Sequence, residues 1–362
     1  MRVFFYVQHL LGIGHLKRAA TLARALRAAG FDVTLASGGA PVEGIGVLQL
    51  PPLRSDASFK NLLDEHGKPV DEAWKARRRD ALLKAFHHVS PDALLIELFP
   101  FGRRQMRFEL IPLLEQADSP LVVCSVRDLL QPNPAREEEA LERFERYFDR
   151  LLVHGDPRVA TFERSFGGAK RLAGKLHYTG YVVEEPAPPG SAGEGEVLVS
   201  VGGGAVGRKL LETAIEARPL TRLRDRTWRI LAGVNFQSLE ELKTSADQGL
   251  IIERARNDFT LRLRNCVLSV SQAGYNTVLE TLQAGARAVL VPFAGGGESE
   301  QTLRARLLAE RGLVQVVEED GLTSATLAAA IDRAAAGARP APGTIDLDGA
   351  RRSAELLRKW LA

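Results

Sequence analysis

The chain contains the same succession of features twice along its 362 residues. An apolar, β-rich run at 3–7 leads into a glycine-containing turn and a segment of helical period, and a run at 197–201 starts the succession again. Strand-like runs that alternate with helical segments form parallel sheets, because each parallel connection needs a crossover that covers one face of the sheet. A chain of this length is also too long for one ordinary core. We therefore predict an α/β protein of two Rossmann-like, doubly wound domains.

Each half has its own set of expected elements. In the first half we expect a helix and five strands, at 15–29 for the helix and at 3–7, 31–36, 93–98, 121–125 and 151–154 for the strands. In the second half we expect a helix and four strands, at 208–217 for the helix and at 197–201, 228–232, 267–271 and 288–291 for the strands.

The boundary between the halves is expected at residues 184–195, which read EEPAPPGSAGEG. Proline, glycine and acidic residues at this density are typical of a linker. We therefore predict an N-terminal domain at 1–183 and a C-terminal domain at 196–349. The last helix, at about 350–362, follows a Pro/Gly-rich stretch and is expected to pack back on the first domain.

Composition excludes several classes of protein. The formal net charge of +3 is too small to indicate a nucleic-acid partner, although it suits an anionic ligand. Cys124 and Cys266 lie in apolar stretches and outside any metal-binding spacing, so we expect buried thiols, no metal and no cofactor. No signal peptide and no bilayer-spanning window is apparent, which predicts a cytoplasmic protein.

The first glycine turn, Gly12-Ile13-Gly14-His15, connects a strand to a helix. Glycines allow a ligand to approach the backbone closely, and a helix N-terminus attracts anions. The third glycine of the dinucleotide fingerprint is missing, which disfavours a nicotinamide dehydrogenase. His15 is expected at the ligand-binding edge of the sheet, with a neutral imidazole that can act as a base. The alternative is a tight turn that binds nothing.

Two further turns lie in the second half. Gly202-Gly203-Gly204 follows a strand and precedes a helix that begins at Arg208, which favours an anion cradle over a merely flexible loop. The next turn has the spacing Ala273-Gly274-x-x-Thr277-x-x-Glu280, and places Glu280 within the second turn of a helix, where a carboxylate can reach ribose hydroxyls. A strand ending in Val-Pro-Phe at 291–293 then leads to Glu300 and Gln301.

These motifs resemble the GT-B glycosyltransferases of the MurG-like, family 28 type. The resemblance covers nearly the whole chain and implies two domains that face a central cleft, the second of which binds a nucleotide-sugar, with a UDP-sugar favoured. It implies the donor-binding residues Gly14, Gly203, Gly204, Arg208, Ala273, Gly274, Thr277, Glu280, Glu300 and Gln301. Among them, Glu280 would bind the ribose, Gly274 and Thr277 the diphosphate, and Glu300 and Gln301 the sugar.

The chain also departs from the family's peptidoglycan enzyme. Gly204 stands where that enzyme has a serine, and Gln272 where it has an arginine, so the donor sugar cannot be carried over. The first turn also resembles that of a UDP-sugar hydrolase of the pseudaminic acid pathway, which makes hydrolysis the alternative to transfer. A sugar-nucleotide epimerase or a non-catalytic binding module of the same fold is a third possibility.

The remaining candidates concern the acceptor, which we expect to be a glycan, a glycolipid or a lipid-linked sugar. Asp128 follows a strand and is the second candidate for a catalytic base, with an ion pair or a helix cap as the alternative. His154 and Glu97 end strands and are candidates for acceptor binding. Segment 99–108 alternates apolar and basic residues, which allows weak peripheral contact with the inner membrane face, although a buried turn with surface arginines is favoured.

Overall fold

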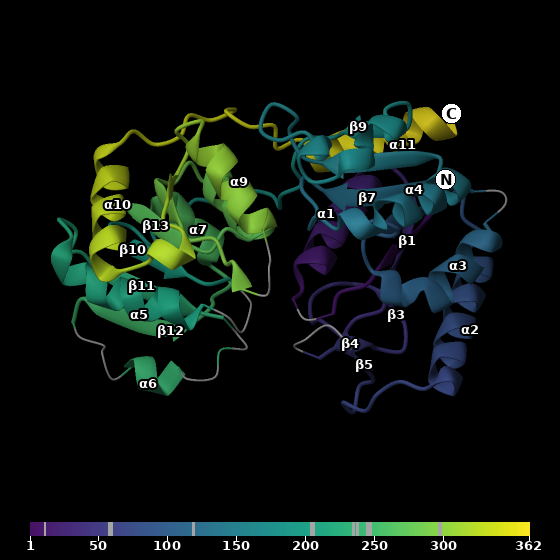
Figure 1. The fold of residues 1–362 in the computed structure, drawn as a ribbon, viewed down its shortest axis with the longest axis horizontal. Helices are drawn as coiled ribbons and strands as arrows, with labels where there is room; N and C mark the ends of the chain where they lie inside the picture. The colour runs from purple at the N-terminus through teal and green to yellow at the C-terminus, as the bar shows by residue number, and fades with distance from the viewer. Residues whose placement is uncertain are drawn as a thin grey trace. The chain divides into compact units, whose positions relative to one another are not determined.

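The computed structural model describes residues 1–10, 12–56, 61–117, 120–202, 207–233, 236, 239–243, 248–295 and 299–362. They form two compact units, each an α/β structure (Figure 1). Unit 1 comprises residues 1–182 and 346–362, and unit 2 comprises residues 183–345.

Within the described residues, unit 1 has a seven-stranded sheet in the order β3-β2-β1-β6-β7-β8-β9. Neighbouring strands in this sheet run parallel. The strands are β1 (Arg2–Val7), β2 (Asp32–Ser37), β3 (Leu48–Gln49), β6 (Ala93–Glu97), β7 (Leu121–Arg127), β8 (Arg150–His154) and β9 (Leu176–Tyr178). A separate antiparallel pair consists of β4 (Arg54–Ser55) and β5 (Leu62–Leu63).

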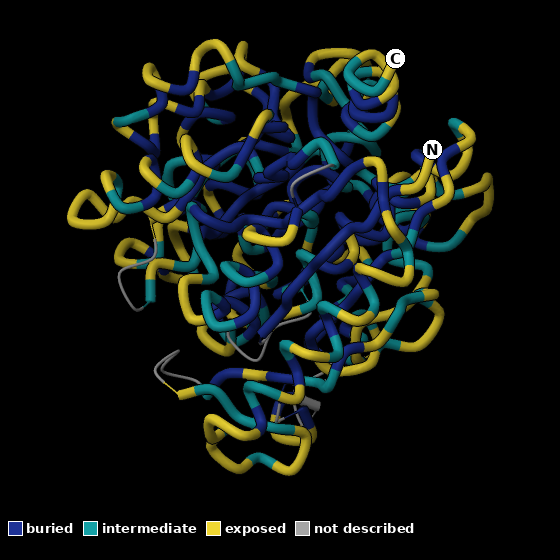
Figure 2. Tube along the Cα trace, turned by 90° about the vertical axis from the view of Figure 1, so that its right-hand side faces the viewer, coloured by how far each residue is buried: buried dark blue, intermediate teal, exposed yellow. Residues whose placement is uncertain are grey.

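The central strands β1, β6, β7 and β8 are buried on both faces, and Figure 2 shows buried segments running through the interior of the fold. The helices are α1 (Gly14–Ala28), α2 (Glu72–Val89), α3 (Arg107–Glu115), α4 (Glu137–Tyr147) and α11 (Gly349–Leu361). Alternate β1 residues enter different cores, since side chains of a strand point to opposite faces. Phe4 and Tyr6 pack with α2, α3 and α4, whereas Val3, Phe5 and Val7 pack with α1 and α11.

Unit 2 repeats this plan with a six-stranded parallel sheet in the described residues, in the order β12-β11-β10-β13-β14-β15. Its strands are β10 (Val197–Ser200), β11 (Trp228–Ala232), β12 (Leu250–Arg254), β13 (Leu268–Ser271), β14 (Ala288–Leu290) and β15 (Gln315–Val316). Its helices are α5 (Arg208–Ala217), α6 (Leu239–Lys243), α7 (Phe259–Asn265), α8 (Tyr275–Gln283), α9 (Glu300–Ala309) and α10 (Ser324–Ala336).

Strand order locates the ligand-binding edge of each sheet. In unit 1 the first strand of the chain lies between β2 and β6, and in unit 2 strand β10 lies between β11 and β13. In unit 1 the chain leaves β1 toward β2 on one side and leaves β6 toward β7 on the other, and in unit 2 it leaves β10 toward β11 and β13 toward β14 in the same way. Open α/β sheets bind ligands where the direction reverses like this, outside the carboxyl ends of the strands. The relevant turns follow β1 and β6 in unit 1, and β10 and β13 in unit 2.

The α/β fold with two parallel sheets, predicted from the sequence, is confirmed. The predicted elements are present, with bounds that shift by one or two residues, and α11 packs against α1. The sequence reading missed the short or partly polar strands β3, β9, β12 and β15. Segment 184–195 lies in unit 2, where Asn265 Nδ2 donates to the carbonyls of Gly190 and Ala192, at 2.7 and 2.9 Å.

Candidate functional site

The turn after β1 ends at the N-terminus of α1. Ile13 is the N-cap residue; no side chain caps the helix, and its first turn contains no acidic residue. A helix N-terminus that lacks a carboxylate of its own keeps its partial positive charge available to an anionic ligand. His15 is the second residue of α1, so its ring lies at this edge of the sheet.

His15 contacts the carboxylate of Glu97, the last residue of β6. The His15 Nδ1 atom lies 2.9 Å from Glu97 Oε2 and 3.0 Å from Oε1. Arg18, one turn further along α1, also donates from Nη2 to Glu97 Oε1. The carboxylate of Glu97 is fully buried, whereas the side chain of His15 keeps 16% of its surface exposed. These contacts of Glu97 with His15 and Arg18 therefore link the end of β6 to the start of α1, the helix that follows β1.

Protonation states follow from burial and charge. Burial lowers the pKa of His15 to about 3, which its neighbour Glu97 only partly offsets. Burial opposes ionisation of Glu97, but His15 and the permanent charge of Arg18 outweigh it and lower the pKa of the carboxyl to about 2. We therefore assign a neutral imidazole beside an ionised carboxylate. Because a carboxylate only accepts hydrogen bonds, Nδ1 carries the proton and Nε2 keeps its lone pair.

The two residues predicted to bind the acceptor are both buried. The Glu97 carboxylate has no exposed surface and contacts His15 and Arg18. His154 is also fully buried. Its Nε2 and Nδ1 atoms lie 2.9 Å from the hydroxyls of Ser125 and Thr179, and burial lowers its pKa to about 3. His154 therefore ties β8 to its neighbours.

Asp128, the second candidate base, is 1% exposed. Its Oδ1 accepts a hydrogen bond from the Leu129 amide at 2.8 Å, and its Cβ packs close to Gly155, where an added Cβ would lie 2.8 Å away. These contacts hold the Asp128 carboxylate against the loop after β7.

In unit 2 the residues that directly follow β10 and β13, Gly202 and Gln272 among them, lie close together. The Gln272 amide donates to the Ser200 carbonyl at 3.3 Å, and a Cβ added to Gly202 would lie 3.6 Å from Thr277 Oγ1. Gly202 has φ +69°, a conformation that favours glycine. The predicted phosphate-binding residues Gly203 and Gly204 lie outside the described residues.

Helix α8 begins directly after this turn, with Gly274 as its N-cap residue. No side chain caps it and its first turn contains no acidic residue, so its N-terminus suits an anion. Ala273, just before the cap, is buried. Thr277 and Glu280 are three residues apart on this helix and therefore share a face. This arrangement can place a diphosphate at the helix N-terminus and a ribose one turn further on.

Three other predicted donor residues have partners of their own. Arg208 lies at the start of α5 and pairs with Glu212 and Glu241, each at 2.7 Å. Glu300 is 2% exposed and pairs with Arg304 at 3.6 Å. The Gln301 Oε1 atom accepts a hydrogen bond from the Phe293 amide at 3.2 Å, so Gln301 holds the backbone at Phe293.

Two arginines at the ligand-binding edges of the two sheets, Arg18 and Arg304, were not predicted from the sequence. Arg18 follows His15 by one helical turn, a spacing that the sequence already shows. Arg304 is 1% exposed, donates to the Ala273 carbonyl at 3.3 Å and lies over the Tyr275 ring at 5.5 Å. It thereby joins α9 to the N-terminus of α8, a contact that spacing alone does not indicate.

The apolar side chains of segment 99–108 are buried or half-buried. Phe99 and Met106 are buried in the core of unit 1, whereas Arg104 and Gln105 are exposed. None of the helices in the described part of the chain is long and apolar enough to cross a membrane. Within those same residues, no group of three or more His, Cys, Asp or Glu side chains is placed to hold a metal ion.

Comparison with known proteins finds glycosyltransferases both among similar sequences and among similar structures. Residues 198–342 match the glycosyltransferase family 28 C-terminal domain. The UDP-N-acetylglucosamine–N-acetylmuramyl-(pentapeptide) pyrophosphoryl-undecaprenol N-acetylglucosamine transferase of Phenylobacterium zucineum is 28% identical over 344 residues, which span 88% of this chain and 86% of that enzyme.

Solved structures share the fold at low sequence identity. The glycotransferase of kitacinnamycin has a TM-score of 0.67 at 17% identity and covers 100% of this chain and 99% of its own. The glycosyltransferase SsfS6 of Streptomyces sp. SF2575, complexed with thymidine diphosphate, has a TM-score of 0.62 at 18% identity, with coverage of 99% and 96%.

Proposed function

This chain is a GT-B glycosyltransferase of the MurG-like, family 28 type, and we propose that it moves a sugar from UDP to an acceptor hydroxyl with inversion at the anomeric carbon. The observation that carries the proposal is the contact between His15 Nδ1 and the Glu97 carboxylate at 2.9 Å. This contact leaves Nε2 as a base on an imidazole that is neutral at physiological pH.

The nucleotide is assigned to unit 2. The N-terminus of α8, which lies beside Gly202, offers backbone amides to a diphosphate, and Glu280 shares a helix face with Thr277. The family 28 domain match covers this part of the chain, the related transferase is named for a UDP-sugar, and a structure of the same fold holds thymidine diphosphate. A UDP-sugar is the donor that these findings favour.

The chemical step is assigned to His15. Nε2 takes the proton of the acceptor hydroxyl while the oxygen attacks the anomeric carbon, and the bond from that carbon to the diphosphate breaks. The diphosphate leaves with the bonding electron pair, which the helix N-terminus of the nucleotide site stabilises. A single displacement of this kind inverts the anomeric configuration. Glu97 keeps the proton on Nδ1, and Arg18 keeps Glu97 ionised.

The acceptor is proposed to be lipid-linked. The related transferase of Phenylobacterium zucineum is named for a pyrophosphoryl-undecaprenol acceptor. Such an acceptor resides in a membrane, so the enzyme would act at the membrane surface. The buried positions of Phe99 and Met106 argue against apolar insertion of segment 99–108, which leaves its arginines as the groups that can face a lipid headgroup.

The test compares His15→Gln with His88→Gln, an exposed histidine on α2. Calorimetry with UDP and a panel of UDP-sugars measures donor binding, and release of UDP in the presence of lipid-linked acceptors measures turnover. We expect His15→Gln to keep the donor affinity and to lose about a hundredfold or more in turnover, as for loss of a general base. His88→Gln should match the wild type. Rapid release of free sugar without acceptor would instead indicate the hydrolase.

A further inference from the structure

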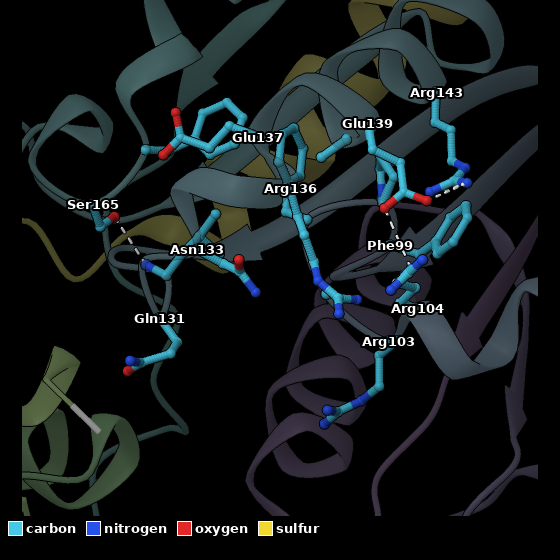
Figure 3. A pocket seen from close by; sticks show the side chains of 16 residues that line it. Phe99, Arg103, Arg104, Gln131, Asn133, Arg136, Glu137, Glu139, Arg143 and Ser165 are labelled. Carbon is cyan, nitrogen blue, oxygen red and sulfur yellow. Dashed lines mark hydrogen bonds and ion pairs between the residues drawn. The ribbon is translucent and has the colours of Figure 1, made fainter. Parts of the chain in front are cut away.

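A cavity of about 160 Å³ lies within unit 1, between the loop after β6 and the N-terminus of α4. Residues 99–104 form one wall, and residues from Leu130 to Arg143 form the other (Figure 3). Neither His15 nor Glu97 lines this cavity. It is therefore a separate feature of the unit that carries the proposed base.

The walls of the cavity carry an excess of positive charge. Four arginines line it, against two carboxylates: Arg103, Arg104, Arg136 and Arg143, with Glu137 and Glu139. Glu139 is shared, since Arg104 and Arg143 pair with it at 3.3 and 2.7 Å, and Arg107 outside the cavity pairs with it at 3.3 Å. One carboxylate cannot neutralise three guanidinium groups, so the cluster keeps a net positive charge.

Arg136 adds a further positive charge to the wall of the cavity. Its side chain is exposed and makes no hydrogen bond or ion pair within the part of the chain that the structure describes. Figure 3 shows the guanidinium groups of Arg136 and Arg104 on the same side of the cavity, with Arg103 extending below them. A planar guanidinium group matches the oxygen geometry of a phosphate.

Aromatic rings make the inner wall of the cavity rigid. The Phe101 ring lies 5.0 to 5.7 Å from the rings of Phe144, Phe162 and Phe166, and Phe99 is buried beside them. An arginine rim over a packed aromatic wall suits a ligand that carries a phosphate on a less polar body.

Arg103 connects this cavity to the proposed base. Its Nε atom donates to the Gln8 carbonyl at 2.8 Å, and Gln8 directly follows β1. The charge of Arg103 also contributes to the lowered pKa values of His15 and Glu97. A group bound by Arg103 is therefore held near the catalytic pair within the same unit.

We propose that this cavity binds a phosphate or diphosphate group of the acceptor, through the guanidinium groups of Arg103, Arg104 and Arg136. The proposal rests on the proposed function, because it assigns the phosphate to the substrate whose hydroxyl His15 deprotonates. The cavity would fix the acceptor by its anionic end and leave the hydroxyl free to approach Nε2.

The test uses Arg136→Gln and, as a matched control, Arg146→Gln. Arg146 is exposed on the same helix, α4, and does not line the cavity. Calorimetry measures binding of inorganic diphosphate and inorganic phosphate to the full chain in saturating UDP, so that the nucleotide site is occupied. We expect Arg136→Gln to weaken diphosphate binding about tenfold or more, as for loss of a charge-assisted hydrogen bond, with UDP affinity unchanged. Arg146→Gln should bind diphosphate as the wild type does.

A second arm separates the sources of the phosphate. Phosphatidylcholine vesicles that contain a polyprenyl phosphate are compared, by co-sedimentation, with vesicles that contain phosphatidylglycerol at equal charge. If the wild type co-sediments only with vesicles that contain the polyprenyl phosphate, and Arg136→Gln does not, the acceptor is lipid-linked. If Arg136→Gln loses diphosphate binding but the wild type does not co-sediment with either kind of vesicle, the acceptor is a soluble phosphorylated molecule. Equal diphosphate binding by Arg136→Gln and the wild type overturns the proposal. Failure of the proposed function would appear separately, as unchanged turnover in His15→Gln.

Discussion

The Nδ1 atom of His15 lies 2.9 Å from Oε2 of Glu97, although 82 positions separate the two residues in the chain. One residue opens the helix after β1, and the other ends β6. The two strands are neighbours in the sheet, with Tyr6 opposite Ile96 in register. The strand order therefore places the proposed base and its orienting carboxylate together at the edge where α/β sheets bind ligands.

This contact predicts a positioning role for Glu97. In Glu97→Gln, the amide NH₂ can donate to Nδ1, which moves the imidazole proton to Nε2 and removes the lone pair that accepts the acceptor's proton. We expect turnover to fall by about a hundredfold while UDP affinity stays at the wild-type level. Nitrogen-15 NMR of the His15 ring should show a protonated Nδ1 in the wild type and a shift toward protonated Nε2 in the variant.

Asp128→Asn serves as the comparison for this prediction. The amide oxygen of asparagine can still accept the hydrogen bond from the Leu129 amide, so the loop after β7 is preserved. Turnover near the wild-type value is expected if His15 is the base. If Asp128→Asn instead loses much of its turnover, and the His15 tautomer is unchanged in Glu97→Gln, then Asp128 and not His15 is the catalytic base.

The buried histidines predict that the protein becomes less stable in acid. His15 and His154 each have a pKa lowered by burial to about 3, against about 6.5 in an unfolded chain. Between these values the unfolded state binds the proton and the folded state does not, so the free energy of unfolding falls as pH drops from 6.5 toward 3. The slope is at most about 1.4 kcal/mol per pH unit for each histidine.

The ionisation of Glu97 also makes the free energy of unfolding fall in acid, but at lower pH than the histidines do. Its pKa is lowered to about 2, so the stability contributed by its ionised form is lost as pH falls below about 4.5 toward 2. Urea denaturation at a series of pH values measures the combined slope. His154→Gln removes one titrating group and should flatten the slope between pH 6.5 and 3. His88→Gln, at an exposed position, should leave the slope unchanged.

Much of the fold could be predicted from the sequence because the central strands are buried on both faces. β1, β6 and β10 are continuous apolar runs that a parallel sheet requires. The missed strands lack this signal. β3 and β15 have two residues each, and β12 ends in Glu253-Arg254. Their pairing depends on the neighbouring strand more than on their own residues.

The candidate site was only partly predictable for a related reason. His15 and the α8 turn are local motifs, and their position at a strand end follows from the sequence. The carboxylate partner is not local. Glu97 meets His15 and Arg18 only once β1 and β6 are known to be adjacent, and His154 contacts Thr179, which follows the missed strand β9. A residue's position at the end of a strand therefore predicts that it lies at the edge of the sheet, but it does not predict whether its side chain is exposed to solvent.

The unit 2 site predicts a large effect of Glu280 on nucleotide binding. Glu280 shares a face of α8 with Thr277, one turn beyond the helix N-terminus. If its carboxylate accepts hydrogen bonds from the ribose, Glu280→Ala should weaken UDP binding by about 1.5–3 kcal/mol, or about tenfold to a hundredfold. Glu212→Ala, on the neighbouring α5, removes an exposed carboxylate that pairs with Arg208 and should not change UDP affinity by more than about twofold. Calorimetry with UDP measures both; equal affinities in the two variants would contradict the ribose assignment.

The last prediction concerns the buried network beneath the first turn. Arg78 is fully buried and donates to both carboxylate oxygens of Glu109, at 2.7 and 2.8 Å. It also donates to the Gln8 side chain at 2.5 Å and to the Gly38 and Pro51 carbonyls, each at 2.7 Å. The network thus ties α2 and α3 to the residue that follows β1.

Arg78→Met removes the cation and leaves Glu109 as a buried, uncompensated charge. Removing one partner of a buried pair costs about 3–5 kcal/mol, whereas replacing both costs much less. We therefore expect Arg78→Met to lower the free energy of unfolding by about this amount, and Arg78→Met combined with Glu109→Gln to recover part of the loss. Urea denaturation measures the two variants, and hydrogen exchange of the β1 amides reports whether the loss is confined to unit 1. The Gln8 Oε1 atom loses the Arg78 donor in both variants. We therefore expect turnover to fall in both, even where stability recovers, which would show that the network also helps to position α1 and His15.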